Sequence, residues 1–330
     1  MNTSRGASLS RRTGDAPRNR RWLNPAPERA EPRPSIEKVE RLSKRTKAEA
    51  LLVVATFIWG VTFVVVKEAL TDATPLPFLA VRFTLASLLL LAVMGRGQID
   101  RKAILPGVFL GLFLFVGFIF QTWGLLYTTP SKSAFITGFS VILVPLIIWF
   151  RGSRLRTPTT VGSLLGLLGL YCLVLPSNLT AVNRGDILTL LGAVAFAFHI
   201  VLVGSYTRRF SFRQLVPTQI LVVGLLSTLS LPFDPNLHLA WTARLIVALI
   251  VTAVLATGFA ITAQNWAQQY TPAAHAAIIF TLEPLFAALT SWLVLGERLG
   301  GRFLVGAGLI MAGMIVSELW GGSVPSPPSG

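Results

Sequence analysis

Charged residues are scarce in this sequence: 13% of its 330 residues are Asp, Glu, Lys or Arg, whereas 53% are hydrophobic. A soluble domain usually carries about 25% charged residues, so this composition is not that of a soluble protein. The single cysteine, Cys172, excludes a disulfide framework and a cysteine-based metal site. With three histidines and no HExxH, GxSxG or GxxxxGK[ST] motif, the sequence lacks the usual signatures of metallohydrolases, serine hydrolases and P-loop ATPases. We therefore expect no cofactor and no metal site, and we expect that the protein is not an enzyme. An integral-membrane enzyme and a passive channel or scaffold are the alternative functions to be tested.

Long apolar runs are abundant between Leu51 and Leu319, and at about 17–25 residues each can cross a bilayer core of ~30 Å as a helix. The alternation of a β-barrel strand is absent from them. The sequence predicts an all-α integral membrane protein with ten transmembrane helices and short loops. The predicted spans are 49–67, 75–95, 103–126, 132–150, 159–176, 186–206, 213–232, 242–267, 273–295 and 301–320.

The N-terminal segment is basic, with thirteen Lys or Arg against six Asp or Glu in residues 1–50. Residues 1–46 have almost no apolar clustering, so we expect a disordered tail, and we expect residues 321–330 to form a short flexible C-terminal tail. The short loops carry nine Lys or Arg on the side of the N-terminal tail and six on the other side, which predicts that both termini are cytoplasmic. In a chain embedded in lipid, a basic tail favours membrane anchoring over nucleic-acid binding. The expected partners are a small-molecule substrate and the lipid bilayer, with a homodimer left open.

The sequence contains an internal duplication. A shift of 143 positions aligns eight identical residues of its two halves, and the aligned pairs are Gln121/Gln264, Trp123/Trp266, Tyr127/Tyr270, Thr128/Thr271, Ala134/Ala277, Ile136/Ile279, Leu146/Leu289 and Trp149/Trp292. Residues 47–178 and 179–320 are therefore interpreted as two five-helix repeats. Because five is an odd number, the repeats must insert in opposite orientations, an arrangement found in many secondary transporters.

Several short motifs carry a resemblance to a known family: Trp59-Gly60, Arg82-Phe83, Tyr127-Thr128-Thr129 and Leu282-Glu283-Pro284. Together with the duplication, they resemble the EamA-like branch of the drug/metabolite transporter superfamily over about residues 48–320. The resemblance implies a multi-pass permease of the cytoplasmic membrane, bacterial by expectation, that works as a secondary transporter and exports small metabolites or amphipathic compounds. It leaves the substrate, the direction of transport and the coupling ion open.

Five polar side chains within or beside the apolar runs are candidates for coupling or gating, because a charge at the bilayer centre costs about 2.5–3.5 kcal/mol. They are Glu283, His199, Lys132, His275 and Arg82. Glu283 lies about halfway across its span, and its counterpart in the first repeat is Ser140. Its carboxyl either carries a proton or contacts the substrate, or it has a structural role in binding helix backbone that Pro284 leaves unpaired. For the other four, an interfacial or packing role is the alternative.

Aromatic and polar side chains are candidates for substrate binding. These are Trp59, Thr62, Gln121, Trp123, Tyr127, Gln264, Asn265, Trp266 and Tyr270. Trp59 and Thr62 lie mid-span, which suits a cavity wall, and the others lie near span ends. A ring beside an amide suits an amphipathic ligand that stacks on one face and hydrogen-bonds at one tip. The aromatic belt at the membrane–water boundary explains Trp and Tyr at span ends equally well, so both alternatives stay open.

Overall fold

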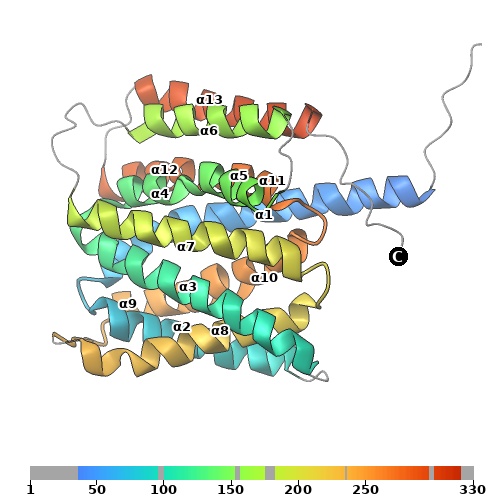
Figure 1. Cartoon of the computed structure of the whole chain (residues 1–330). Coiled ribbons are helices and arrows are strands. Elements are labelled where there is room, and N and C mark those ends of the chain that lie inside the picture. Colours follow the sequence, from blue (N-terminus) through green and yellow to red (C-terminus); the bar gives the residue numbers. More distant parts are fainter. Residues whose placement is uncertain are drawn as a thin grey trace, which may run out of the picture.

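The structure, a computed structural model, describes residues 36–95, 100–152, 157–174, 183–234, 236–296 and 301–320. Across these residues the fold is all-α, and the single β-bridge joins Ala73 to Leu239 (Figure 1). The helices of the first half are α1 (Ile36–Ala69), α2 (Pro75–Met94), α3 (Arg101–Tyr127), α4 (Pro130–Gly138), α5 (Ser140–Phe150) and α6 (Thr157–Val174). Those of the second half are α7 (Arg184–Tyr206), α8 (Phe212–Leu229), η1 (Leu231–Phe233), α9 (Ala243–Ile250), the π-helical η2 (Val251–Phe259), α10 (Ala260–Ala267), α11 (Ala273–Phe280), α12 (Glu283–Leu295) and α13 (Gly301–Trp320).

Among the described residues, eight helical segments are long and apolar enough to cross a membrane. They are Ser43–Ala69, Pro75–Met94, Arg101–Tyr127, Pro130–Phe150, Arg184–Tyr206, Phe212–Leu229, Ala243–Ala267 and Ala273–Leu295. Each corresponds to one of the ten predicted spans, and the other two predicted spans coincide with α6 and α13. Many large apolar side chains on these helices are exposed on the bundle surface, as lipid contact requires. The protein is therefore an all-α membrane protein with eight candidate spans in the part of the chain that the structure describes.

Three predicted spans are not the continuous helices that the sequence analysis expected. Span 132–150 is divided into α4 and α5 at Phe139, span 273–295 into α11 and α12 at residues 281–282, and span 242–267 contains the π-helical η2. Pro284 accounts for the second break, because proline lacks the N–H of a helical hydrogen bond and its ring collides with the preceding turn. The N-terminal boundary also differs, since α1 begins at Ile36 and residues 36–46 are helical. The rest of the predicted N-terminal tail, residues 1–35, and the predicted C-terminal tail, residues 321–330, lie outside the described residues.

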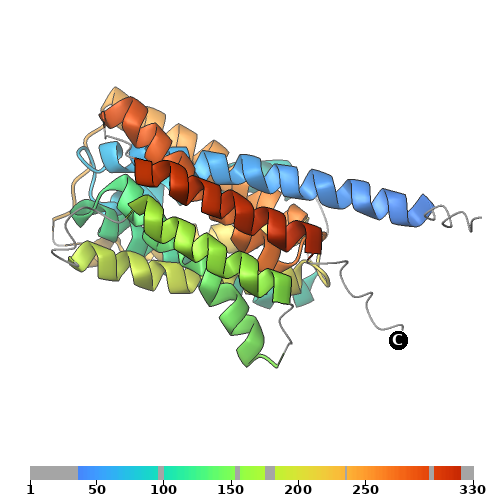
Figure 2. The same cartoon turned by 90° about the horizontal axis from the view of Figure 1, so that it is seen from above.

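Helices α6 and α13 form an antiparallel pair on one side of the bundle (Figures 1 and 2). A Cβ atom added to Gly169 would lie 2.7 Å from the carbonyl oxygen of Gly306, and one added to Gly313 would lie 2.7 Å from the carbonyl oxygen of Gly162. Only residues without a side chain permit this approach of two backbones. The two contacts exchange equivalent positions of the duplication, so the repeats meet here about a local twofold relation.

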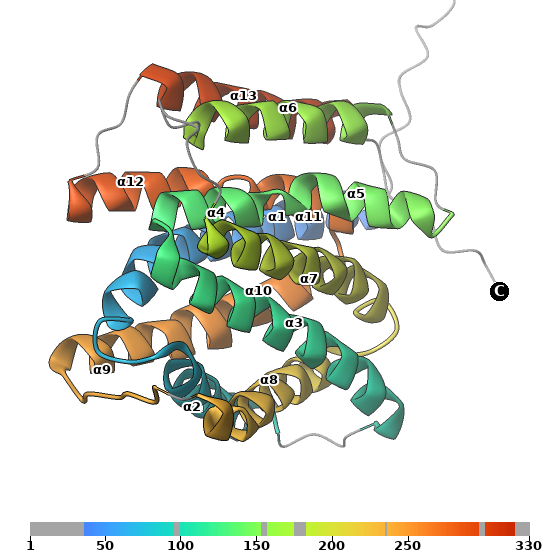
Figure 3. The ribbon, with the colours of Figure 1, turned by 60° about the vertical axis from the view of Figure 1, so that its left-hand side comes forward.

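The broken helices form the next layer, in which α4 lies beside α12 and α5 beside α11 (Figure 3). Helix α1 packs against α10, α11 and α12, and its counterpart α7 packs against α3, α4 and α5. Each repeat thus packs its first helix against the third helix and the broken pair of the other repeat. Because helices of one half pack against helices of the other, the space that they enclose lies at the interface of the repeats.

One end of the bundle is held by polar contacts between the two repeats. The α1–α2 connection exchanges backbone hydrogen bonds with residues 238–240, from Thr74 N to His238 O (2.9 Å) and from Ala240 N to Asp72 O (2.8 Å). Both Nε and Nη2 of Arg244 donate to the Asp72 carboxylate at 2.8 Å. These hydrogen bonds and that of Thr242 lower the pKa of Asp72 to about 2. The carboxylate is therefore charged throughout the physiological pH range.

Candidate functional site

A cavity of about 80 Å³ lies at the interface of the repeats. Its walls come from both halves of the chain, namely Trp59, Thr62, Phe63, Val66, Arg82, Leu114, Phe118, Gln121, Thr122, Leu125, Thr137, Ser140, Phe196, His199, Ile200, Ile261, Gln264, Phe280 and Glu283. Four pairs in this set are related by the shift of 143 residues, namely Phe118/Ile261, Gln121/Gln264, Thr137/Phe280 and Ser140/Glu283. The duplication therefore provides opposite walls of one cavity.

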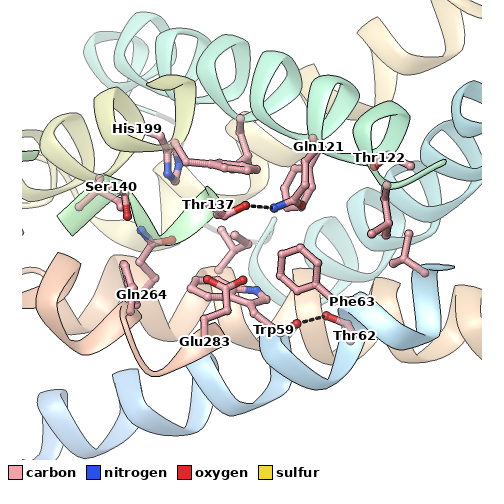
Figure 4. Close-up of a pocket in the computed structure, with 18 of the residues that line it drawn as sticks. Trp59, Thr62, Phe63, Gln121, Thr122, Thr137, Ser140, His199, Gln264 and Glu283 are labelled. Carbon is pink, nitrogen blue, oxygen red and sulfur yellow. Dashed lines mark hydrogen bonds between the residues drawn. The ribbon is translucent and has the colours of Figure 1, made fainter. Parts of the chain in front are cut away.

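The two helix breaks place Ser140 and Glu283 in the cavity wall, because α5 begins at Ser140 and α12 begins at Glu283 (Figure 4). Gly60 of α1 packs against the start of α12. A Cβ at Gly60 would lie 2.6 Å from Cβ of Phe286 and 2.8 Å from the carbonyl oxygen of Glu283. The position of Glu283 thus depends on the absence of a side chain at residue 60.

The Glu283 side chain is buried, with 8% of its surface exposed, and it lines the cavity. Within the described part of the chain its carboxyl has no hydrogen-bond or ion-pair partner, whether side chain or backbone. The backbone contact to residues near Pro284, one of the two alternatives of the sequence analysis, is therefore not formed. The carboxyl is positioned to interact with the contents of the cavity.

His199 belongs to a buried hydrogen-bonded chain that crosses three helices. Asn265 Nδ2 donates to the carbonyl oxygen of Ile261 (2.9 Å), which fixes the orientation of its amide, because a carbonyl oxygen only accepts. Asn265 Oδ1 then accepts from Gln219 Nε2 (3.2 Å), so Gln219 Oε1 faces His199 Nε2 (2.8 Å) and must accept from it. The chain requires a hydrogen on Nε2, so in the neutral ring Nδ1 is the acceptor.

Arg82 is buried in the cavity wall, with 4% of its surface exposed. Its Nε donates to Thr257 Oγ1 at 3.1 Å, and its guanidinium carbon lies 4.9 Å from the ring centre of Phe83 and 4.7 Å from that of Phe118. Thr257 belongs to η2, and π-helical turns are frequent at functional sites. No carboxylate among the described residues forms an ion pair with this arginine, and an interfacial role for it stays a prediction.

The other cavity candidates are fixed by the protein itself. Trp59 Nε1 donates to the carbonyl oxygen of Ala256 in η2 (2.9 Å), and the Trp59 ring meets Phe280 edge-on with a centroid distance of 5.4 Å. Thr62 Oγ1 donates to Trp59 O, and Gln121 Nε2 donates to Thr137 Oγ1 at 3.0 Å (Figure 4). These contacts hold one indole face and several amide and hydroxyl groups around an apolar space.

The remaining candidates from the sequence lie outside the cavity lining. Trp123, Tyr127, Trp266 and Tyr270 line no part of it, and Asn265 contributes through the His199 chain alone. Tyr127 is 40% exposed and stacks under the Arg184 guanidinium at 3.7 Å, which favours the alternative of an interfacial aromatic residue.

Lys132 and His275 also lie away from the cavity. Lys132 Nζ forms an ion pair with Asp186 at 2.6 Å, close to the start of α4. His275 Nδ1 contacts Arg45 Nη2 at 3.2 Å, close to the start of α11. Lys132 therefore links the two repeats, whereas His275 links the second repeat to the part of α1 that precedes the first repeat, each through a charged partner.

Most of the apolar lining was not predicted from the sequence, including Phe63, Phe118, Phe196 and Phe280, and neither was Thr137. Apolar residues in a membrane protein carry no mark that separates a cavity wall from a lipid-facing surface. The repeat relation could have identified two of them, because Phe280 and Thr137 are equivalent positions one turn before Glu283 and Ser140. No group of three or more His, Cys, Asp or Glu among the described residues could hold a metal ion.

Comparison with known proteins identifies the family. The model of the EamA-like transporter family matches this chain twice, over residues 46–175 and 183–319. An uncharacterized transporter of Archaeoglobus fulgidus is 36% identical over 277 residues, covering 84% of this chain and 87% of that protein. The uncharacterized transporter YoaV of Bacillus subtilis is 21% identical over 81% of this chain and 94% of its own length.

Two further similarities concern location and fold. The uncharacterized inner membrane transporter YedA of Escherichia coli K12 is 32% identical over 146 residues, which cover 43% of this chain and 48% of YedA. A solved crystal structure shares the fold, with a TM-score of 0.67 at 18% sequence identity, and the match covers 83% of this chain and 97% of the chain in that structure. The two family matches together span most of the sequence, and they divide it where the duplication does. The chain belongs to the EamA-like transporter family, within the drug/metabolite transporter superfamily.

Proposed function

We propose that the chain is a secondary transporter of small organic solutes, and that the cavity between the repeats is its substrate site. The observation that carries the proposal is the cavity wall, to which equivalent positions of both repeats contribute and in which charged side chains are buried. Transporters with inverted repeats bind substrate at the repeat interface, beside interrupted helices whose ends face the site. The breaks at Ser140 and Glu283 agree with that arrangement.

In this proposal the chain crosses the membrane ten times, with α6 and α13 as the fifth and tenth spans and with both termini in the cytoplasm. The antiparallel contact of α6 with α13 supports opposite insertion of the two repeats. Reporter fusions after Gly152 and at the C-terminus should give a cytoplasmic signal, and a fusion at position 180 an external one. A cytoplasmic signal at position 180 would refute the inverted arrangement.

Transport proceeds by alternating access, and we propose export coupled to protons through Glu283. The carboxyl faces the cavity without a protein partner among the described residues, so it can exchange a proton or contact a solute when the cavity opens to either side. Lys132 and His275, which contact Asp186 and Arg45 outside the cavity lining, are proposed as gating residues. The cavity lies within one chain, so this mechanism requires no second copy.

A cavity of about 80 Å³ favours small metabolites over drug-sized compounds, whose pockets usually measure about 300–1,000 Å³. The test is uptake into liposomes that contain the purified full-length protein, with an imposed pH gradient and a panel of radiolabelled amino acids, organic acids, nucleosides and lipophilic cations. We expect saturable flux of at least one small solute that depends on the pH gradient. Flux no greater than in protein-free liposomes across the panel would contradict a transport function.

A further inference from the structure

Arg82 places an unpaired cation in the wall of a membrane-embedded cavity. Only 4% of the surface of Arg82 is exposed. Among the described residues, the guanidinium has one hydrogen-bond partner, Thr257 Oγ1, which accepts from Nε. No carboxylate of a described residue, including that of Glu283 in the same wall, lies within 4.0 Å of the guanidinium nitrogens. An arginine has five N–H donors, so the four on Nη1 and Nη2 have no acceptor among the described residues.

The surroundings hold the guanidinium without occupying the edge that it would present to a ligand. Phe83 and Phe118 lie against the cation at 4.9 and 4.7 Å, and such stacking leaves the in-plane N–H groups available. Thr257 fixes Nε, which orients the plane. A charge kept in the membrane interior is costly unless it is paired, so an unpaired one marks a functional site by default.

We infer that the cavity takes a small organic anion, and that the Arg82 guanidinium binds its carboxylate. The planar fork of N–H groups matches a carboxylate with two parallel hydrogen bonds, which a lysine could not reproduce. Trp59, Phe63, Phe196 and Phe280 surround the same space, so the body of the solute is apolar or aromatic. This inference rests on the proposed transport function and narrows its substrate class to monocarboxylates.

A free carboxylic acid and a zwitterionic amino acid would present the same group to Arg82. Glu283 lines the same cavity, and an ionised Glu283 would favour a solute that also carries an ammonium group. The probes therefore include isovalerate and phenylacetate, their neutral amides, and leucine and phenylalanine. Comparison of the acids with the amino acids distinguishes the two sources.

The experiment measures binding of these probes to the purified full-length protein by isothermal titration calorimetry. We expect the carboxylate-bearing compounds to bind about 10- to 100-fold more tightly than the matching amides, the range expected for loss of a charge-assisted hydrogen bond. Arg82→Gln should remove this preference, and Arg82→Lys should restore it in part. Arg213→Gln, at an exposed arginine at the start of α8, is the matched control and should bind as the wild type does.

Three results would overturn the inference: no carboxylate in the series binds, amides bind as tightly as acids, or Arg82→Gln retains the preference for acids. If Arg82→Gln is poorly folded, the acid–amide comparison in the wild type and the Arg82→Lys variant still decides. Saturable transport of a neutral or cationic solute, without carboxylate binding, would refute this inference and leave the transport function intact. Absence of any flux in the liposome panel would instead refute the transport function.

Discussion

Substitution of Gly60 by alanine should displace the helix that carries Glu283. The added Cβ would lie 2.6 Å from Cβ of Phe286 and 3.0 Å from the backbone nitrogen of Ala287, whereas carbon atoms in contact prefer about 3.5–4.0 Å. The Ala287 nitrogen is a backbone atom and the position of Phe286 Cβ is set by the backbone, so no rotamer change relieves these contacts. The start of α12 must move by about 1 Å, and overpacking of this kind typically costs about 1–3 kcal/mol.

The measurement is the apparent melting temperature of the purified protein together with solute flux in liposomes. We expect Gly60→Ala to lower the melting temperature by several degrees, at about 2–4 °C per kcal/mol, and to reduce flux. Gly308→Ala is the matched control, because a Cβ at this position of α13 meets no atom within 4 Å and alanine favours the helix. If both variants melt and transport as the wild type does, the close contact of α1 with α12 is not what positions Glu283.

Two further substitutions test contacts outside and behind the cavity. Asp72→Asn should lower the melting temperature by the same amount at pH 5 and pH 8. Because the pKa of Asp72 is lowered to about 2 in the folded protein, its carboxylate stabilises the fold fully above the ordinary pKa of about 3.9, and this stabilisation is lost only as the pH falls from about 3.9 to about 2. A smaller effect at pH 5 would contradict a permanently charged Asp72. Gln219→Leu should leave the buried His199 Nε2–H and Asn265 Oδ1 unpaired, at about 1–3 kcal/mol each, and a wild-type melting temperature would contradict the hydrogen-bonded chain.

The sequence predicted the helical membrane class and the family, and its internal repeat related two positions that the structure places in the cavity wall. Ser140 and Glu283 were related by the shift of 143 residues, and both line the cavity. The helix breaks at these positions were not predicted, because apolar residues continue through them without a change of pattern. Pro284 was the one local sign, and it has no counterpart at Val141 in the first repeat.

Contacts between distant helices were beyond the reach of sequence reasoning. Gln219 and Asn265 are 20 and 66 positions from His199, and nothing in their spacing indicates a shared hydrogen-bonded chain. Tyr127 was a reasonable substrate-binding candidate, yet it lies under Arg184 away from the cavity. Because tyrosine suits both a ligand site and the membrane interface, its identity alone could not decide between the two roles.

We propose that Glu283 couples solute movement to protons from within the cavity. The most direct test of this claim compares Glu283→Gln with the wild type in liposomes, using a solute from the panel that the wild type transports. The amide is nearly isosteric but cannot release a proton, so we expect net flux driven by a pH gradient to be lost, whereas exchange of labelled for unlabelled solute continues. Wild-type rates of pH-driven net flux in Glu283→Gln would contradict the claim.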